Sequence, residues 1–241
     1  TLVSSRYYLR GMRDRSTASA RARRSAAISI DIVLCAPRGR HLAVLLVRAG
    51  AHQHGRWSLP RAPFAAGVGF DETATATATT ALGRPPGWLA QVATVEGAIR
   101  HPATVAVTVG YVGVVDEGAE ALAEGAQWFT IAELPALAQA HRTLITVALS
   151  ALRERMDSAP IAFRMLPSAF SLAELQAVYE LLLGRRLHKA SFRRTLHAAL
   201  VVASTGEWRR EGPGRPAQLF RFSPRRRKAG RHGVRFEMLG G

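Results

Sequence analysis

The chain has 241 residues, 48% of them hydrophobic, and a formal net charge of +16. This length is enough for two modest domains, and no apolar stretch reaches the roughly 18 residues of a membrane span, which excludes a membrane-spanning helix. Cys35 is the only cysteine; it excludes an intramolecular disulfide and predicts a reduced, cytoplasmic compartment.

The positive charge is concentrated in the two flanks of the chain. Residues 1–25 hold seven arginines and one acid, residues 26–156 hold ten arginines and ten acids, and residues 157–241 hold sixteen basic and six acidic residues. A basic flank beside a neutral block indicates a polyanionic partner, most often nucleic acid. The alternative, a solvated surface in an arginine-rich proteome, fits a confined charge of +10 poorly.

Residues 1–25 form a basic leader for which we expect disorder or a loose helix. Such a segment is either a transit peptide or an upstream extension, with Met12 as the true start. From Ala26 onward the alternation of apolar residues over 28–32 predicts a strand, followed by a turn at residues 38–40 and a second strand over 41–47.

The middle of the chain predicts a mixed sheet flanked by helices. Residues 73–82 alternate threonine with alanine, and we expect a helix there although β-branched threonine is a poor helix former. Strands are predicted over residues 91–97, over 105–115 and from Trp128. A short turn or helix follows at residues 131–135, and a longer helix over 144–156.

Residues 57–83 have the outline of the Nudix hydrolase box, G-x5-E-x7-R-E-U-x-E-E-x-G-U, in which U is aliphatic. The segment WSLP at residues 57–60 resembles the usual lead-in. The core R-E-U-x-E-E falls on residues 80–85 if Asp71-Glu72 supplies the first glutamate, or on 76–81 if Gly83 is the closing glycine. Neither register contains an acid.

Nudix hydrolysis needs clustered carboxylates that hold divalent cations on a diphosphate and activate water. We therefore expect no catalytic residue, no metal and no cofactor, and a frame that binds a ligand without cleaving it. Asp71 and Glu72 could hold a cation weakly, but a pair at a helix start is more often a cap that interacts with the helix dipole.

Three residues near this frame are candidate ligand-binding residues: Trp57, Arg61 and Arg100. Trp57 could stack on an adenine, as could Trp88, although packing in the core is the better default for both.

The carboxy-terminal part predicts a winged helix-turn-helix. Ser171 and Glu174 form a capping box that opens an amphipathic helix ending at Gly184. A second helix is predicted over residues 189–200, with Phe192, Leu196 and Leu200 buried. A hairpin follows over residues 207–222, with its turn at 211–214.

The second helix leaves a basic face, as a helix that reads DNA requires. The alternative is an ordinary solvated face, but further arginines at the hairpin tip favour DNA binding, with the wing reaching the minor groove or the phosphates. The predicted DNA-binding residues are Lys189, Ser191, Arg193, Arg194, His197, Arg209, Arg210 and Arg215. The basic tail over 225–241 contacts phosphates or serves only solubility.

Over about residues 26–224 the chain resembles the Nudix-related transcriptional regulators of bacterial NAD metabolism, the NrtR family. The resemblance is carried by FRMLP at 163–167, FSLAELQAVY at 170–179, KASFRR at 189–194, GRPA at 214–217 and, earlier, AQWF at 126–129. The chain departs from the usual pattern at Arg61-Ala62, where L-P-G-G is normal, and in a lengthened loop over 64–70.

The resemblance implies an α+β fold: a degenerate Nudix-like α/β/α domain over 26–156 for effector binding and dimerisation, then a winged-helix DNA-binding domain over 163–224. It also implies a homodimer on palindromic operators of NAD-biosynthesis genes, with ADP-ribose or a related nucleotide as effector.

Our hypothesis is a DNA-binding regulator, a repressor of NAD-biosynthesis genes, that is not an enzyme. Two alternatives stay open: a residual Nudix hydrolase with acids supplied from elsewhere, such as Glu96 or Glu120, and a dimerising scaffold without a ligand.

Overall fold

The structure is a computed structural model that describes residues 28–48, 57–96, 101–103, 105–118, 122–210 and 215–223. The predicted leader over 1–25, the tail over 225–241 and the candidate residue Arg100 lie outside the described residues.

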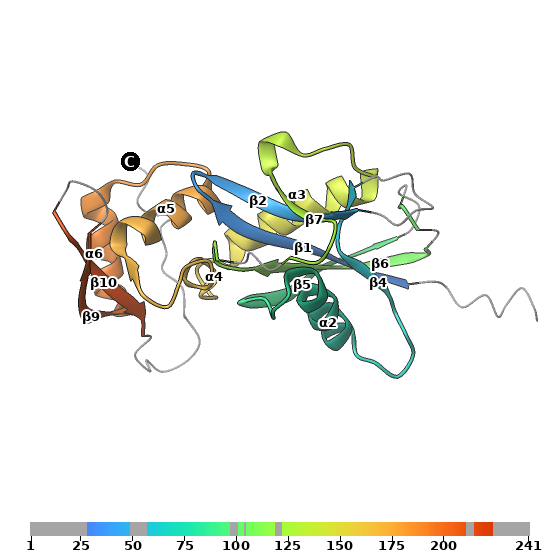
Figure 1. Ribbon diagram of the computed structural model, residues 1–241, viewed down its shortest axis with the longest axis horizontal. Helices are drawn as coiled ribbons and strands as arrows, with labels where there is room; N and C mark the ends of the chain where they lie inside the picture. The colour runs from blue at the N-terminus through green and yellow to red at the C-terminus, as the bar shows by residue number, and fades with distance from the viewer. Residues whose placement is uncertain are drawn as a thin grey trace, which may run out of the picture.

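A mixed sheet between helices, which the sequence predicts, forms the middle layer of the first domain (Figure 1). It has seven strands, and two of them, over 57–58 and 61–63, were not predicted. Its strands are β1 (Ile28–Arg38), β2 (His41–Arg48), β3 (Trp57–Ser58), β4 (Arg61–Pro63), β5 (Trp88–Glu96), β6 (Val107–Val114) and β7 (Ala126–Thr130). The order is β3-β2-β1-β6-β5, with β4 paired to β1 and β7 paired to β2. The β1–β6 pair is parallel and the other pairs are antiparallel.

Two helices cover the opposite faces of this sheet, α2 (Phe70–Leu82) on one side and α3 (Gln139–Arg155) on the other (Figure 1). Successive side chains of β1 point to opposite faces of the sheet, as in any strand. Ile30 and Ile32 pack in the cluster that contains the α2 alanines, whereas Val33 packs in the cluster that contains Leu144 of α3. The short 3-10 helix η2 (Ile131–Glu133) lies between β7 and α3 in the chain.

Helix α2 forms despite its threonines because its alanine face packs in the core, and the threonine hydroxyls find acceptors on their own helix. The Oγ atoms of Thr75, Thr77 and Thr79 each donate to the carbonyl four residues earlier, at 2.7 Å. Ala74 and Ala78 are fully buried against the sheet. Alanines therefore pack against the sheet, and the threonine hydroxyls on the other side bond to carbonyls of the same helix. The helix begins at Phe70, three residues before the predicted start.

The carboxy-terminal part is a winged helix. Its elements are α4 (Ile161–Arg164), β8 (Phe170–Ser171), α5 (Leu172–Leu183), α6 (Lys189–Ala199), β9 (Val202–Arg209) and β10 (Ala217–Phe222), with the antiparallel sheet order β8-β10-β9. The predicted capping box is confirmed: Ser171 Oγ accepts from the Glu174 N–H at 3.2 Å, and Glu174 Oε2 accepts from the Ser171 N–H at 2.6 Å. Helix α5 ends at Gly184 in the left-handed conformation, also as predicted.

The two parts share one continuous hydrophobic cluster. It runs from Leu144 and Leu152 of α3 through Ile161 and Phe163 to Leu196 of α6. The Arg153 Nε–H, near the end of α3, donates to the Leu182 carbonyl of α5 at 2.9 Å. The winged helix is thus packed directly onto the α3 side of the first domain.

Further sequence expectations need correction. Leu200, predicted to be buried, is 43% exposed, because α6 ends at Ala199 and Leu200 takes a left-handed φ of 52° that turns the chain off the helix toward β9. The helix predicted over 144–156 begins at Gln139. In the part of the chain that the structure describes, no helix is long and apolar enough to cross a membrane.

Candidate functional site

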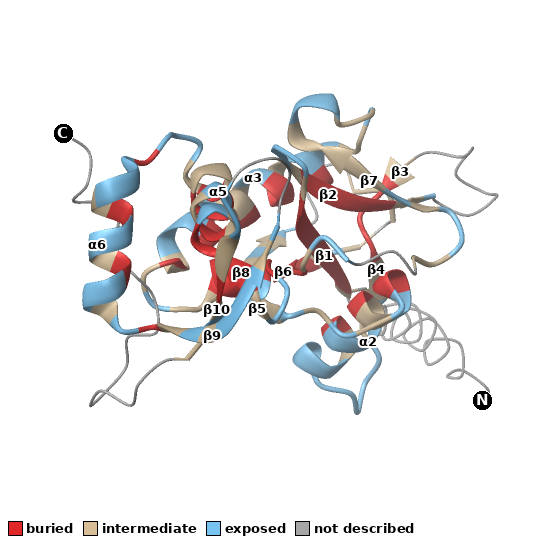
Figure 2. Ribbon diagram, turned by 60° about the vertical axis from the view of Figure 1, so that its left-hand side comes forward, coloured by how far each residue is buried: buried red, intermediate tan, exposed pale blue. Residues whose placement is uncertain are grey.

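A groove lies between helix α6 and the β9–β10 hairpin, with a volume of about 780 Å³. Lys189, Arg193 and His197 line it from α6, and Trp208 and Arg215 line it from the hairpin. Helix α6 stands at the outer edge of the molecule, with a broad exposed surface (Figure 2). The groove therefore combines cations from two elements and is open to a macromolecule.

The face of α6 that is buried determines which of its side chains line the groove. Phe192 and Leu196 have no exposed surface and fix the inner face of the helix. Because residues four apart share a helix face, Lys189, Arg193 and His197 form one exposed row along its edge. Arg194 is exposed on the same helix but does not line the groove.

The other predicted DNA-binding residues lie in different surroundings. The hydroxyl of Ser191 is 3.3 Å from His188 Nδ1, and Arg210 is exposed just after β9. Arg209 instead pairs with Glu174 of the capping box, at 2.5 Å between Nη2 and Oε2. The structure thus gathers Lys189, Arg193, His197 and Arg215 in one groove and holds Arg209 against α5; the DNA-contacting roles stay predictions.

Glu180 fixes the turn between α5 and α6, a role that the sequence analysis missed. Its Oε1 atom accepts from the Leu187 N–H at 2.9 Å and from the Gln176 side chain at 3.0 Å. Burial raises the pKa of Glu180, but these hydrogen bonds and the nearby Arg186 outweigh burial and hold the pKa below its ordinary value. A glutamate near a helix end offers no sequence signal for such a long-reaching bond.

At the Nudix-like helix the only acids of α2 are Asp71 and Glu72 in its first turn. The pair lies in the first turn, where it can interact with the helix dipole as expected, but the N-cap is Gly69 and no side chain makes a capping hydrogen bond. Asp71 Oδ1 instead accepts from the buried Tyr111 hydroxyl at 2.5 Å. Burial, and then the bond to Asp71, raise the pKa of Tyr111. One of the two carboxylates, that of Asp71, is therefore already bonded to another side chain of the protein.

Of the three candidate ligand-binding residues, the structure describes Trp57 and Arg61. Trp57 packs edge-on against Phe129, with ring centroids 4.7 Å apart, and the Arg48 guanidinium lies 4.8 Å from its ring centroid. Arg61 lies on β4, opposite Asp31 of β1. Trp57 thus follows the packing alternative, and its role in ligand binding stays untested.

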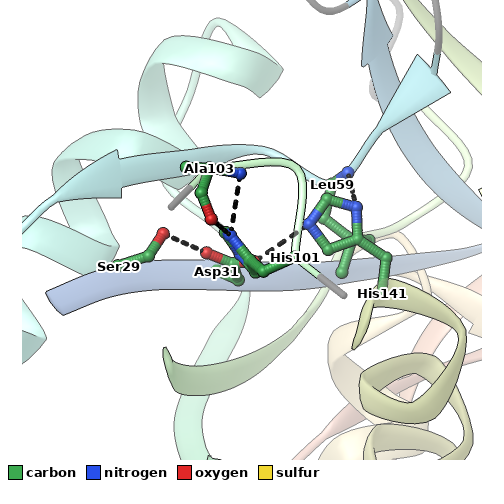
Figure 3. Close-up of polar contacts among 6 residues, drawn as sticks. All are labelled: Ser29, Asp31, Leu59, His101, Ala103 and His141. Carbon is green, nitrogen blue, oxygen red and sulfur yellow. Dashed lines mark hydrogen bonds and ion pairs between the residues drawn. The ribbon is translucent and has the colours of Figure 1, made fainter. Parts of the chain in front are cut away.

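A buried polar cluster, missed by the sequence analysis, surrounds Asp31 (Figure 3). Asp31 Oδ2 accepts from His101 Nε2 at 2.8 Å and from His141 Nε2 at 3.0 Å, and Oδ1 accepts from the Ser29 hydroxyl. Burial raises the pKa of Asp31, but these hydrogen bonds outweigh burial and lower it. Burial lowers the pKa of His101, and the bond to Asp31 more than reverses this, so that the pKa is raised.

Two histidines and an aspartate are also ligands that zinc prefers. Here, however, the hydrogen bonds place a ring proton on the nitrogen that would have to bind the metal. His141 Nδ1 accepts from the buried Leu59 N–H at 3.2 Å, which leaves the ring proton on Nε2, pointing at Asp31. A metal would need the lone pair on that same Nε2. The cluster instead ties β1, the residues after β5, the segment before β4 and the start of α3 together.

No spacing motif could have revealed this cluster, because residues 31, 101 and 141 are far apart in the sequence and meet only in the folded sheet.

The fold and its groove define a winged-helix protein of the DNA-binding type, joined to a Nudix-like domain whose helix lacks the hydrolase acids. A family model described as the NrtR DNA-binding winged helix domain matches residues 162–222. The ADPR responsive transcriptional repressor NtrR of Acinetobacter baylyi is 30% identical over 215 residues, covering 83% of this chain and 83% of that protein. The chain therefore belongs to the NrtR family.

Solved structures agree with this assignment. The crystal structure of Shewanella oneidensis NrtR complexed with a 27mer DNA is 29% identical, with a TM-score of 0.72, and the match covers 82% of this chain and 94% of that one. A MutT/nudix family protein from Enterococcus faecalis is 17% identical with a TM-score of 0.64, over 92% of this chain and 100% of that one, and shows the shared fold alone. The predicted order, a Nudix-like domain followed by a winged helix, is confirmed.

Proposed function

We propose that the protein is a DNA-binding transcriptional repressor whose Nudix-like domain senses ADP-ribose or a related nucleotide without hydrolysing it. The observation that carries the proposal is the groove in which three α6 side chains and Arg215 of the wing converge. Its relatives support the same function: the Acinetobacter protein is an ADPR responsive transcriptional repressor, and the Shewanella protein was crystallised with a 27mer DNA.

The chemistry of the α6 row suits the major groove, which admits an α-helix. Arg193 and Lys189 can donate to guanine O6 and N7, and His197 extends the row. Arg215 on the wing then reaches the neighbouring phosphates or the minor groove. Arg209 joins them only if its ion pair with Glu174 opens.

The charge distribution supports a polyanionic partner. Residues 157–241 carry sixteen basic and six acidic residues, whereas residues 26–156 are balanced. Each phosphate neutralised by a Lys or Arg releases condensed counterions, so affinity should fall steeply with salt. A family homodimer on a palindromic site would present two such grooves.

The proposed lack of hydrolysis follows from the Nudix-like helix. Metal-assisted cleavage of a diphosphate needs several carboxylates in one place. In α2, residues 73–82 contain only threonine, alanine and leucine, and Asp71 is bonded to Tyr111. The hydrolase alternative would need Glu96, which is exposed at the end of β5, or Glu120, which lies outside the described residues.

Footprinting on the protein's own upstream region, with and without ADP-ribose, tests the proposal. We expect a protected palindrome that ADP-ribose releases. Protection that ADP-ribose leaves unchanged would favour the ligand-free scaffold, and no protection on this or any selected duplex would remove the regulator assignment.

A further inference from the structure

We propose that Trp208 is the apolar anchor of the wing on duplex DNA, packing on deoxyribose in the backbone beside the recognition helix. The inference rests on the proposed DNA-binding function and deepens it. Trp208 lines the same groove as Lys189, Arg193 and Arg215, and among the described residues that line it Trp208 is the only large apolar side chain that is exposed.

The exposure of Trp208 needs an explanation. It is 63% exposed, more than the other exposed large hydrophobic residues of the described chain, which are Val68, Phe70 and Leu200 at 37–43%. It makes no ring contact with any residue that the structure describes. Burying an aromatic side chain stabilises a protein substantially, so a tryptophan left in water beside a basic groove indicates a surface that covers it when the partner binds.

A β-bulge directs this side chain. Trp208 pairs with Gln218 and Ser204 pairs with Phe220, so three residues, 205–207, stand opposite Leu219 alone. The Thr205 hydroxyl donates to the Leu219 carbonyl at 3.1 Å, and Gly206 takes a φ of 81° that favours glycine. Bulges re-aim the side chains beside them, and this one is held by its own hydrogen bonds.

The next residue holds the strand in place. Arg209 reaches Glu174 of α5 and does not line the groove, whereas Trp208 does. Adjacent side chains on a strand point to opposite sides. The Arg209–Glu174 pair therefore ties β9 to α5 while Trp208 remains on the groove side.

The chemistry of indole favours the DNA backbone over the bases. Its flat apolar face matches a deoxyribose ring, and its single N–H can donate to a phosphate oxygen. With α6 in the major groove, the hairpin lies over the adjoining backbone, which alternates sugar and phosphate. The neighbouring Arg215 and Lys189 supply the charge that phosphates require, and Trp208 supplies the contact for the sugar.

The test compares Trp208→Ala and Trp208→Phe with the wild-type full-length protein on a duplex selected by the wild type from a random library. Covering about 60 Å² of apolar surface corresponds to roughly a tenfold change in affinity. We expect Trp208→Ala to weaken binding about tenfold by fluorescence anisotropy, and Trp208→Phe to weaken it less. The slope of log affinity on log salt and the preferred sequence should both stay unchanged, because no charge and no base contact is lost.

Two matched variants separate this contact from other effects. Val68→Ala removes an exposed apolar side chain far from the groove and should not change affinity. Arg215→Ala should reduce the steepness of the salt slope by about 0.9 per site. If Trp208→Ala loses its fold by circular dichroism, loss of the DNA-induced change in tryptophan fluorescence in Trp208→Phe serves as the readout.

Wild-type affinity in Trp208→Ala, or a wild-type fluorescence response in Trp208→Phe, would overturn the inference. A changed sequence preference would also overturn it, since Trp208 would then be reading or unstacking bases. Failure of the wild type to bind any duplex would instead overturn the proposed function itself.

Discussion

Replacing Arg193 by alanine removes the central cation of the α6 row and leaves the core of the helix untouched. The groove holds three permanently charged side chains, Lys189, Arg193 and Arg215. At about −0.9 in log–log salt slope per phosphate contact, they predict a slope of about −2.7 for one winged helix and about twice that for a dimer. Arg193→Ala should weaken binding by roughly 1–3 kcal/mol per winged helix if the arginine reads a base.

The assay is fluorescence anisotropy on a selected duplex over a series of salt concentrations. Arg221→Ala is the matched control, because Arg221 is an exposed arginine of β10 that does not line the groove. If Arg193 contacts a base, its loss also relaxes the preference at one position; if it contacts a phosphate, the slope becomes shallower by about 0.9. Equal affinity and slope in both variants would refute the assignment of α6 as the recognition helix.

Three further predictions concern the rest of the chain. ADP-ribose with magnesium should be turned over more slowly than about 0.1 per second, far below ordinary enzymes, by chromatography of the products; faster turnover would mean that acids outside α2 assemble a site. Phe192→Ala should destabilise the winged helix by about 3–5 kcal/mol in urea unfolding, since Phe192 has no exposed surface; a stable variant would show that this helix face is not core. The pKa of His101 is raised in the folded protein above its ordinary value of 6.5. The ion pair between His101 and Asp31 should therefore stabilise the fold fully at pH values below 6.5, and less as the pH rises through the folded pKa. Because the pKa of Asp31 is lowered, its carboxylate stays charged even at pH 3.8, which is the ordinary pKa of an aspartate. The gap in unfolding free energy between wild type and His101→Ala should therefore shrink as pH rises, and a gap that grows would reverse the assigned charges.

Local signals in the sequence predicted the winged helix well. The Ser171–Glu174 capping box, the left-handed Gly184 and the buried Phe192 and Leu196 all depend on neighbours within one or two helical turns. The prediction that Leu200 is buried was wrong because Leu200 takes a left-handed conformation and the helix ends at Ala199, one position early. The spacing of apolar residues alone does not show such an end.

Features that depend on contacts between distant segments were missed. The cluster of Asp31, His101 and His141 forms only when the sheet and α3 meet, and the bond between Asp71 and Tyr111 likewise joins α2 to β6. The Arg209–Glu174 pair shows the same limit: the sequence places an arginine on the wing but not the direction of its side chain. Charge and spacing predicted which surface is basic, and packing decided which cations share the groove.

The most direct test of the central claim is the affinity of the full-length wild type for its selected palindromic duplex, measured by anisotropy with increasing ADP-ribose. A repressor that ADP-ribose releases from DNA must bind this ligand and DNA with opposing coupling, because a ligand shifts an equilibrium only through its differential affinity for the two states. We predict a salt-sensitive complex whose affinity falls at least about fivefold, a coupling of about 1 kcal/mol, while the ADP-ribose stays intact. Tight DNA binding that is indifferent to ADP-ribose, or release that occurs only as ADP-ribose is cleaved, would contradict the account.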